Sequence, residues 1–299
     1  MADIYIGLMS GTSADSIDCA ALDLSSEEIK VLSCSNFEIP VDLKKDIIQS
    51  SQSEKIEQEL INDLDFRMAE LLVDSVKEII SYSGIEVEDI KAIGSHGQTI
   101  KHEPKSKNPY TLQIGDPKKI SNDLNITTVG NFRDDDIKAG GEGAPLTPVF
   151  HNKFFGSDRK RKSIVNIGGI TNITALNYPE LIGFDTGPGN CLMDCWSRIH
   201  DVGDYDDKGS WASSGTINLP LLGMMMEDEY FSRKYPKSTG PDYFNLEWIE
   251  DNLSRLSEDI SIEDVQATLV QVTVISLIES INSLNLSNEN IYLCGGGVH

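Results

Sequence analysis

The sequence predicts an α/β protein of two domains, and three observations support this. The chain has 299 residues, against roughly 150 residues for a typical domain. Predicted strands alternate with two long apolar-patterned helices. Each half also opens with the same local pattern, in which a strand, a glycine-containing polar turn and a second strand follow one another. The two copies share too little identity to be called a repeat, but they favour a duplicated architecture.

The first half opens with this β-turn-β pattern. Residues 3–9 predict a buried strand, SGTSADS predicts the turn, and IDCAALDL predicts the second strand. Apolar residues recur at the helical period over 54–83, which predicts one long helix that ends at Gly84. The remaining predictions in this half are a strand within 90–100 that leads into a loop, a loop over 101–109, and strands at 110–117 and 126–132.

The second half begins after a segment dense in glycine and proline, RDDDIKAGGEGAPLTP. This change of composition predicts domains over residues 1–133 and 134–299. A solvated turn is expected at Arg159–Lys162, a basic segment in an otherwise acidic chain. The later elements are predicted as strand-turn-strand over 163–177, strand-turn-helix over 181–196, a helix over 262–284, and a strand in 291–299 that runs into three glycines.

Composition excludes several classes of function. The formal net charge is −23, and so acidic a surface repels nucleic acid and anionic membranes. The N-terminus lacks the basic region of a signal peptide, and no apolar run is expected to reach the roughly 18 residues that cross a bilayer. A cytoplasmic protein that binds neither nucleic acid nor membrane is therefore predicted.

The cysteines also indicate a cytoplasmic protein. Five scattered cysteines favour free thiols in a reducing compartment. Cys191 and Cys195 could share a helix face, but a zinc site would need two more ligands. We therefore expect small buried thiols.

Four glycine-rich turns follow predicted strands. Glycine lets a backbone approach an anion closely and direct N–H groups at it. One such turn could be an ordinary tight turn, but four favour a phosphate-binding cleft. None matches the P-loop or the G-x-G-x-x-G fingerprint. The turns are Gly11-Thr12-Ser13, Gly168-Gly169, Gly187-Pro188-Gly189 and Gly295-Gly296-Gly297.

Two sets of carboxylates accompany these turns. Asp185 ends a predicted strand directly before TGPG, where a general base would be useful. The alternative is that Asp185 caps a helix that begins near Asn190. Asp15 and Asp18 flank the first turn, and one of them could meet a hydrated Mg²⁺ or simply cap the turn.

Polar residues in two loops form a second candidate group. His96 and Gln98 follow a strand, as binding residues often do. Arg133 could bind a carboxylate through two hydrogen bonds, or pair with the aspartates at 134–136. No Ser-His-Asp arrangement or nucleophile elbow is visible, so acyl transfer has no support.

Nine segments together resemble the anhydro-N-acetylmuramic acid kinase family, in order and from end to end. Any one of them is weak, but the series is specific. The segments are GLMSGTSADSID (7–18), SHGQT (95–99), QIGDP (113–117), NFRDDDIKAGGEGAPLTP (131–148), NIGGITNIT (166–174), GFDTGPGN (183–190), YDDKGSWASSG (205–215), PKSTGPDYFN (236–245) and CGGGVH (294–299).

The resemblance implies a two-domain actin-like (ribonuclease H-like) fold with ATP and Mg²⁺ in its cleft. It implies phosphorylation of the 6-oxygen of 1,6-anhydro-N-acetylmuramic acid while water opens the anhydro bridge, a step of cell-wall peptidoglycan recycling. Asp185 matches the aspartate that activates the water. His96, Gln98, Thr99 and Arg133 match the sugar side. The nucleotide side is matched by Gly11, Thr12, Ser13, Ala14, Asp15, Ser16, Ile17, Asp18, Gly168, Gly169, Gly187, Gly189, Gly295, Gly296 and Gly297.

The chain departs from the family pattern at two positions and at its end. Ser16 stands where glycine is usual and Glu142 where glutamine is usual. Family members continue past CGGG, so we expect part of the C-terminal domain to be missing. The alternatives are a non-catalytic sugar-binding remnant, another sugar kinase of the same fold, and a glycoside hydrolase, which would need a second carboxylate and leave the turns without a purpose. A homodimer also stays open.

Overall fold

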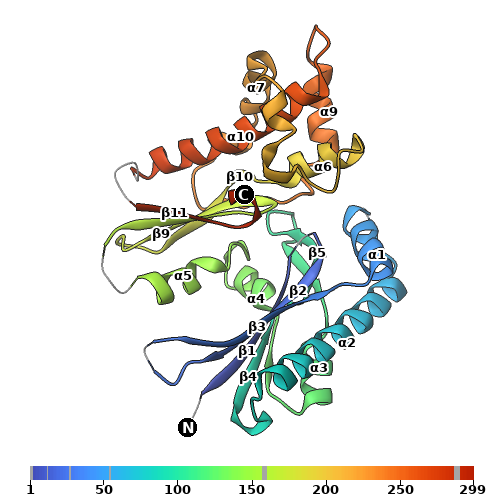
Figure 1. The fold of residues 1–299 in the computed structure, drawn as a ribbon, viewed down its shortest axis with the longest axis vertical. Coiled ribbons are helices and arrows are strands. Elements are labelled where there is room, and N and C mark those ends of the chain that lie inside the picture. The colour runs from blue at the N-terminus through green and yellow to red at the C-terminus, as the bar shows by residue number, and fades with distance from the viewer. Residues whose placement is uncertain (1–2, 12, 27, 54, 157–159, 286–289) are drawn as a thin grey trace. The chain divides into compact units, whose positions relative to one another are not determined.

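The structure is a computed structural model that describes residues 3–11, 13–26, 28–53, 55–156, 160–285 and 290–299 (Figure 1). Contacts within the chain group Met1–Gly143 into one compact unit and Ala144–His299 into a second. Each unit has its own sheet and its own apolar core. The domain limits 1–133 and 134–299 stay a prediction.

The first unit contains a five-stranded sheet in the order β3-β2-β1-β4-β7. Strands β1 (Ile4–Ser10), β2 (Ser16–Asp23) and β3 (Lys30–Glu38) form an antiparallel meander. Strand β4 (Ile90–Ser95) pairs with β1 in parallel, and β7 (Thr128–Val129) pairs with β4 in parallel. The predicted β-turn-β unit is confirmed.

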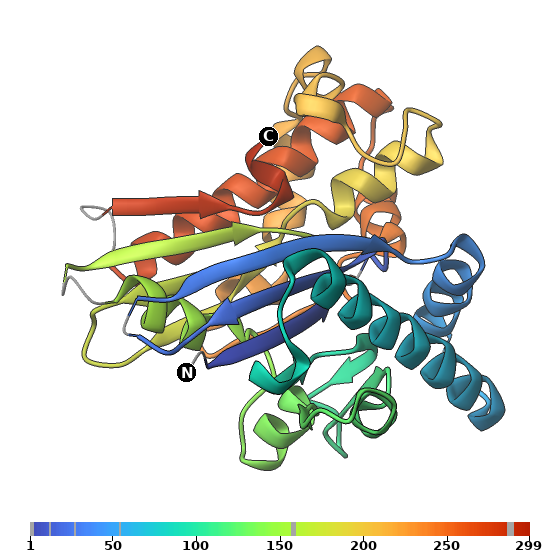
Figure 2. The same cartoon turned by 60° about the horizontal axis from the view of Figure 1, so that its bottom comes forward.

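Helices cover one face of this sheet. Helix α2 (Gln58–Ser83) packs on β2 and β3 and follows α1 (Val41–Gln52) (Figures 1 and 2). The prediction of one helix over 54–83 therefore begins too early, although its end is confirmed, since Gly84 adopts φ +65° there. The core combines β1 residues such as Ile6 with α2 residues such as Met68 and Leu72.

Two further predictions in this unit need correction. The expected loop over 101–109 begins as strand β5 (Gln98–Glu103), which pairs with β6 (Tyr110–Ile114). The strand expected over 126–132 is reduced to two residues, because Asn131 turns the backbone at φ +61° and α4 (Phe132–Lys138) begins. Helix α3 (Pro117–Leu124) lies between these segments, and Asp116 accepts the Lys118 amide at its start.

The second unit contains a four-stranded sheet in the order β10-β9-β8-β11. Strands β8 (Lys162–Ile167), β9 (Ile170–Leu176) and β10 (Ile182–Pro188) form an antiparallel meander, and β11 (Asn290–Cys294) pairs with β8 in parallel. The two sheets thus share a meander whose first strand is flanked by a parallel strand. This repeated order confirms the duplicated α/β architecture that the sequence predicts.

Helices pack on both faces of the second sheet. Figure 1 shows α10 (Ile262–Ser283) over one face and α5 (Thr147–Phe155) over the other. Helices α6, α7 and α9 pack with α10 around a core that includes Trp196, Leu221 and Leu269. Their bounds are α6 (Cys191–Ile199), α7 (Leu219–Met226), α8 (Glu229–Ser232) and α9 (Leu246–Ser254), with single 3₁₀ turns at Asp207–Gly209, Ala212–Ser214 and Gly296–Val298.

Helix α10 corrects the expectation about apolar runs. Within the described residues it is the one helix long and apolar enough to cross a membrane by length and composition alone. Half of its most apolar stretch of 18 residues is buried inside the protein. The helix also buries polar side chains such as Thr273 and Ser276. These features are those of a core helix.

Candidate functional site

Two of the glycine-rich turns interlock at one end of the second sheet. The amides of Gly189 and Cys191 donate to the carbonyl of Gly169 at 2.8 and 3.1 Å, and the Asn190 amide donates to Gly168 at 2.7 Å. A Cβ at Gly189 would lie 2.1 Å from the Gly168 oxygen. Glycine at 189 is therefore required for close packing, and these three amides are already engaged in internal hydrogen bonds.

The third turn of this unit joins them at the carboxyl end of β11. Gly295 has φ +92°, and a Cβ there would lie 2.5 Å from the Ile167 oxygen at the end of β8. A Cβ at Gly297 would lie 2.3 Å from Ile167 Cγ2. Three of the four predicted glycine turns thus converge where the parallel strands β8 and β11 end, which is where ligands of α/β proteins usually bind.

The fourth turn joins β1 and β2 in the first unit. It is tight, because the Ala14 amide donates to the Gly11 carbonyl at 3.1 Å. The side chains of Ala14 and Ile17 are fully buried in the core, so only their backbone can face a ligand. Thr12 lies outside the described residues.

The carboxylates beside this turn contact neighbouring side chains. Asp15 forms an ion pair with Lys44, and Asp18 accepts a hydrogen bond from Asn36. Both aspartates keep exposed side chains. Among the described residues, no group of three or more His, Cys, Asp or Glu could hold a metal ion.

His96 and Arg133, which the family resemblance assigns together to the sugar side, contact each other in the first unit. Arg133 Nε donates to His96 Nε2 at 2.8 Å, and Arg133 Nη1 donates to the Gly143 carbonyl at 2.7 Å. Burial, and next the Arg133 charge, lower the pKa of His96 to about 4. His96 is therefore a neutral hydrogen-bond acceptor near pH 7, and it orients the guanidinium.

Gln98 and Thr99 extend this group along β5. Gln98 is fully buried, and its Oε1 accepts from Ser10 Oγ at 2.6 Å. Thr99 Oγ1 accepts from Gln113 Nε2 at 3.2 Å. The ends of β1 and β6 therefore fix these two side chains.

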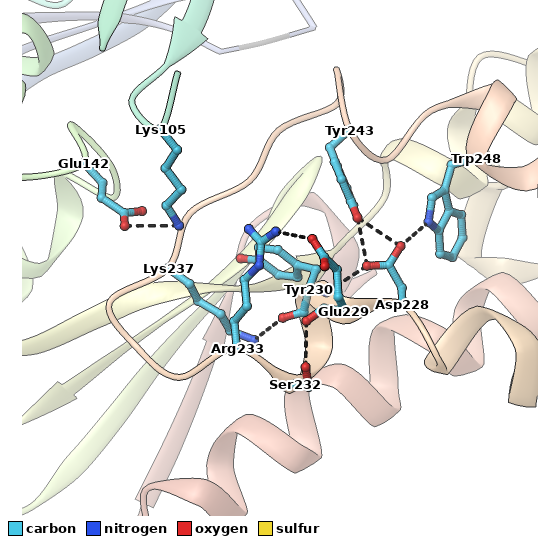
Figure 3. A network of polar contacts seen from close by, with 10 residues as sticks. All are labelled: Lys105, Glu142, Asp228, Glu229, Tyr230, Ser232, Arg233, Lys237, Tyr243 and Trp248. Atoms are coloured by element: carbon cyan, nitrogen blue, oxygen red, sulfur yellow. Dashed lines mark hydrogen bonds and ion pairs between the residues drawn. The ribbon is translucent and has the colours of Figure 1, made fainter. Parts of the chain in front are cut away.

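His102 is a member of this group that the sequence reasoning missed. Burial and the Arg133 charge lower its pKa to about 4, and its Nδ1 lies 3.1 Å from Thr111 Oγ1. Nearby, Glu142 forms an ion pair with Lys105 at 3.1 Å (Figure 3). Because 101–109 was assigned to a loop, the sequence reasoning did not place His102 on the strand that carries Gln98 and Thr99.

Asp185 is a buried residue of β10, 5% exposed. Its Oδ2 accepts the Thr239 amide at 3.1 Å, and its own amide donates to the Lys237 carbonyl at 3.1 Å. Helix α6 begins at Cys191, after Asn190, and the described contacts of the Asp185 carboxylate lie with Thr239 instead. The alternative role as a helix cap is therefore not supported.

The Tyr230 hydroxyl donates to the Asp185 carbonyl at 2.7 Å. Tyr230 belongs to a polar network that the sequence reasoning also missed (Figure 3). Asp228 accepts the Tyr230 amide at 2.8 Å, the Trp248 Nε1–H at 2.8 Å and the Tyr243 hydroxyl at 2.9 Å. Burial and the bond to Asp228 raise the pKa of Tyr243 to about 12. The PKSTGPDYFN segment was noted only as a motif, and nothing local in it indicates these partners.

Comparison with known proteins gives one consistent result. A family model described as anhydro-N-acetylmuramic acid kinase matches residues 3–299. A protein of that name from Photobacterium profundum is 39% identical over 304 residues, covering 99% of this chain and 80% of its own length. Another from Sulfurovum sp. is 41% identical over 293 residues, covering 98% and 80%. A solved Ppx/GppA family member from Aquifex aeolicus aligns over 100% of this chain and 95% of its own, with a TM-score of 0.41 and 7% identity.

Proposed function

The chain belongs to the anhydro-N-acetylmuramic acid kinase family, and from this premise we propose its reaction. ATP, water and 1,6-anhydro-N-acetylmuramic acid give N-acetylmuramic acid 6-phosphate and ADP. One observation supports the assignment of the catalytic carboxylate. Asp185, two residues before the Gly187 turn, has a buried carboxylate that accepts a hydrogen bond from the Thr239 amide.

Asp185 acts as the general base in this proposal. Its carboxylate takes a proton from water while the water oxygen attacks the anomeric carbon. The bond from that carbon to the 6-oxygen breaks, and the 6-oxygen attacks the γ-phosphorus as the bond to ADP breaks. A carboxylate within a hydrogen-bonded frame is suited to this role, because general bases depend on fixed geometry.

The glycine turns supply the phosphate side. Phosphoryl transfer depends mostly on positioning and charge neutralisation. The amides of Gly189, Asn190 and Cys191 are used internally, so we assign phosphate contacts in this unit to Gly168, Gly169, Gly296 and Gly297. The turn Gly11–Asp18 contributes the remaining nucleotide contacts.

Magnesium fits as an ion carried by ATP. The exposed carboxylates of Asp15 and Asp18 flank the first turn, and the described residues offer no dense ligand cluster. An ion that keeps most of its waters needs only such an arrangement. When bound, Mg²⁺ neutralises charge on the phosphates.

The sugar side is assigned to His96, Gln98, Thr99 and Arg133. Arg133 is oriented by His96 and the Gly143 carbonyl, so its cationic fork can meet the carboxylate of the sugar's lactyl group. The Lys105–Glu142 ion pair offsets the negative charge that Glu142 adds near an anionic substrate. We also propose that the protein works in the cytoplasm.

The test is Asp185→Asn, assayed by ADP release with Mg-ATP and the anhydro sugar. We expect the rate to fall by about 10²–10⁴-fold, while stabilisation of the protein by the sugar against heat is retained. Asp251→Asn on the exposed side of α9 is the matched control. Full activity in Asp185→Asn would refute the assignment.

The same assay separates the alternatives. Thermal stabilisation by the sugar without ADP release from the unsubstituted chain would identify a sugar-binding remnant. ADP release with a different sugar only would identify another sugar kinase. Release of the opened sugar without ATP would identify a hydrolase.

A further inference from the structure

Three residues of the second unit form a closed ring of hydrogen bonds. The Asp185 amide donates to the Lys237 carbonyl at 3.1 Å. The Lys237 ammonium donates to the Tyr230 carbonyl at 3.2 Å. The Tyr230 hydroxyl then donates to the Asp185 carbonyl at 2.7 Å. The ring joins strand β10, helix α8 and the segment 233–245.

Every member of the ring is buried. Tyr230 is 1% exposed, Lys237 is 4% exposed and Asp185 is 5% exposed. The Lys237 ammonium also lies 4.6 Å from the centre of the Tyr230 ring, a favourable cation–π contact. Hydrogen bonds of this kind are strong in a dry interior, and leaving one unmade is costly. The ring of hydrogen bonds between Asp185, Lys237 and Tyr230 therefore has a single preferred geometry.

Asp228 accepts hydrogen bonds that hold the elements carrying this ring of hydrogen bonds. This carboxylate caps α8 through the Tyr230 amide and also accepts from Tyr243 and Trp248 (Figure 3). Tyr243 lies on the segment 233–245, which also carries Lys237, and Trp248 lies on α9. Helix α8 and this segment are thus held to the same anchor.

We propose that Tyr230 is the positioning residue of Asp185. Its hydroxyl fixes the peptide that follows Asp185, and its carbonyl fixes Lys237, which places the Thr239 amide on the Asp185 carboxylate. A short carboxylate points where its backbone directs it, and small displacements of a reacting group cost large factors in rate. The inference rests on the proposed role of Asp185 as the base.

The test is Tyr230→Phe, which removes one oxygen. We expect kcat to fall by about ten- to a hundredfold, with the KM values for ATP and sugar changed less than twofold. In an Asp185→Asn background the same substitution should leave the residual rate unchanged, because Tyr230 acts through Asp185. Tyr82→Phe is the matched control, since Tyr82 is 70% exposed and bonds only to Glu78 in the described contacts.

Hydrogen exchange tests the ring without turnover. In Tyr230→Phe we expect the amides of Asp185 and Thr239 to exchange at least tenfold faster, while amides of β8 keep their protection. Unchanged protection at both amides would overturn the proposal, as would an equal loss of rate with and without the Asp185 carboxylate. Normal activity in Asp185→Asn itself would refute the proposed function instead.

Discussion

The stability of the first unit should fall as the pH drops through the range set by His96. Its pKa is about 4 in the folded chain, against an ordinary value of 6.5. Between these values the unfolded chain binds a proton at His96 and the folded chain does not, so acid favours unfolding. The part of this loss that is due to His96 begins below about pH 6.5, reaches about 2 kcal/mol at pH 5 and levels off below about pH 4.

The assay is urea unfolding followed by far-ultraviolet circular dichroism at pH 7 and pH 5. His96→Gln keeps a hydrogen-bond acceptor for Arg133 but does not titrate. We expect the variant to lose about 2 kcal/mol less than the unsubstituted chain between the two pH values. His299→Gln, at an exposed position, should behave like the unsubstituted chain. An equal loss in His96→Gln would refute the reasoning.

Two further substitutions test the packing of the second unit. Gly189→Ala should lower the free energy of unfolding by about 1–3 kcal/mol, because its Cβ would lie 2.1 Å from the Gly168 oxygen. In Gly223→Ala, on α7, the added Cβ would have nothing within 4 Å, so this substitution should instead raise the free energy of unfolding by up to about 1 kcal/mol. Thermal unfolding measures both changes. An equal effect of the two substitutions would contradict the packing argument. Asp228→Asn should lower the pKa of Tyr243 from about 12, which ultraviolet titration measures, and an unchanged value would exclude the Asp228 charge as a cause.

Local patterns in the sequence predicted several elements well. The two β-turn-β units follow from alternating apolar residues interrupted by glycine and hydroxyl side chains. The end of α2 follows from Gly84, which reaches φ +65° without a steric penalty. The strand before Gly295 follows from the run IYLC. In each case the deciding interactions lie within a few residues along the chain.

The sequence predictions were wrong where a single residue or a distant partner strand determines the secondary structure. The strand expected over 126–132 stops early because Asn131 adopts φ +61°, a conformation that no pattern of apolar residues reveals. His102 was assigned to a loop, and only the pairing of β5 with β6 puts it on a strand. Pairing of this kind depends on the partner strand as much as on the residue itself.

The sequence by itself determined the fold class, the glycine turns and Asp185 as the carboxylate of interest. Only the tertiary structure decided what holds Asp185 and which amides of the turns are already used. Tyr230 and Thr239 reach Asp185 from 45 and 54 residues away. Such contacts form because helix α8 and the segment after it pack over the end of β10. A sequence pattern records the local preferences of a residue, but not which distant groups packing brings to it.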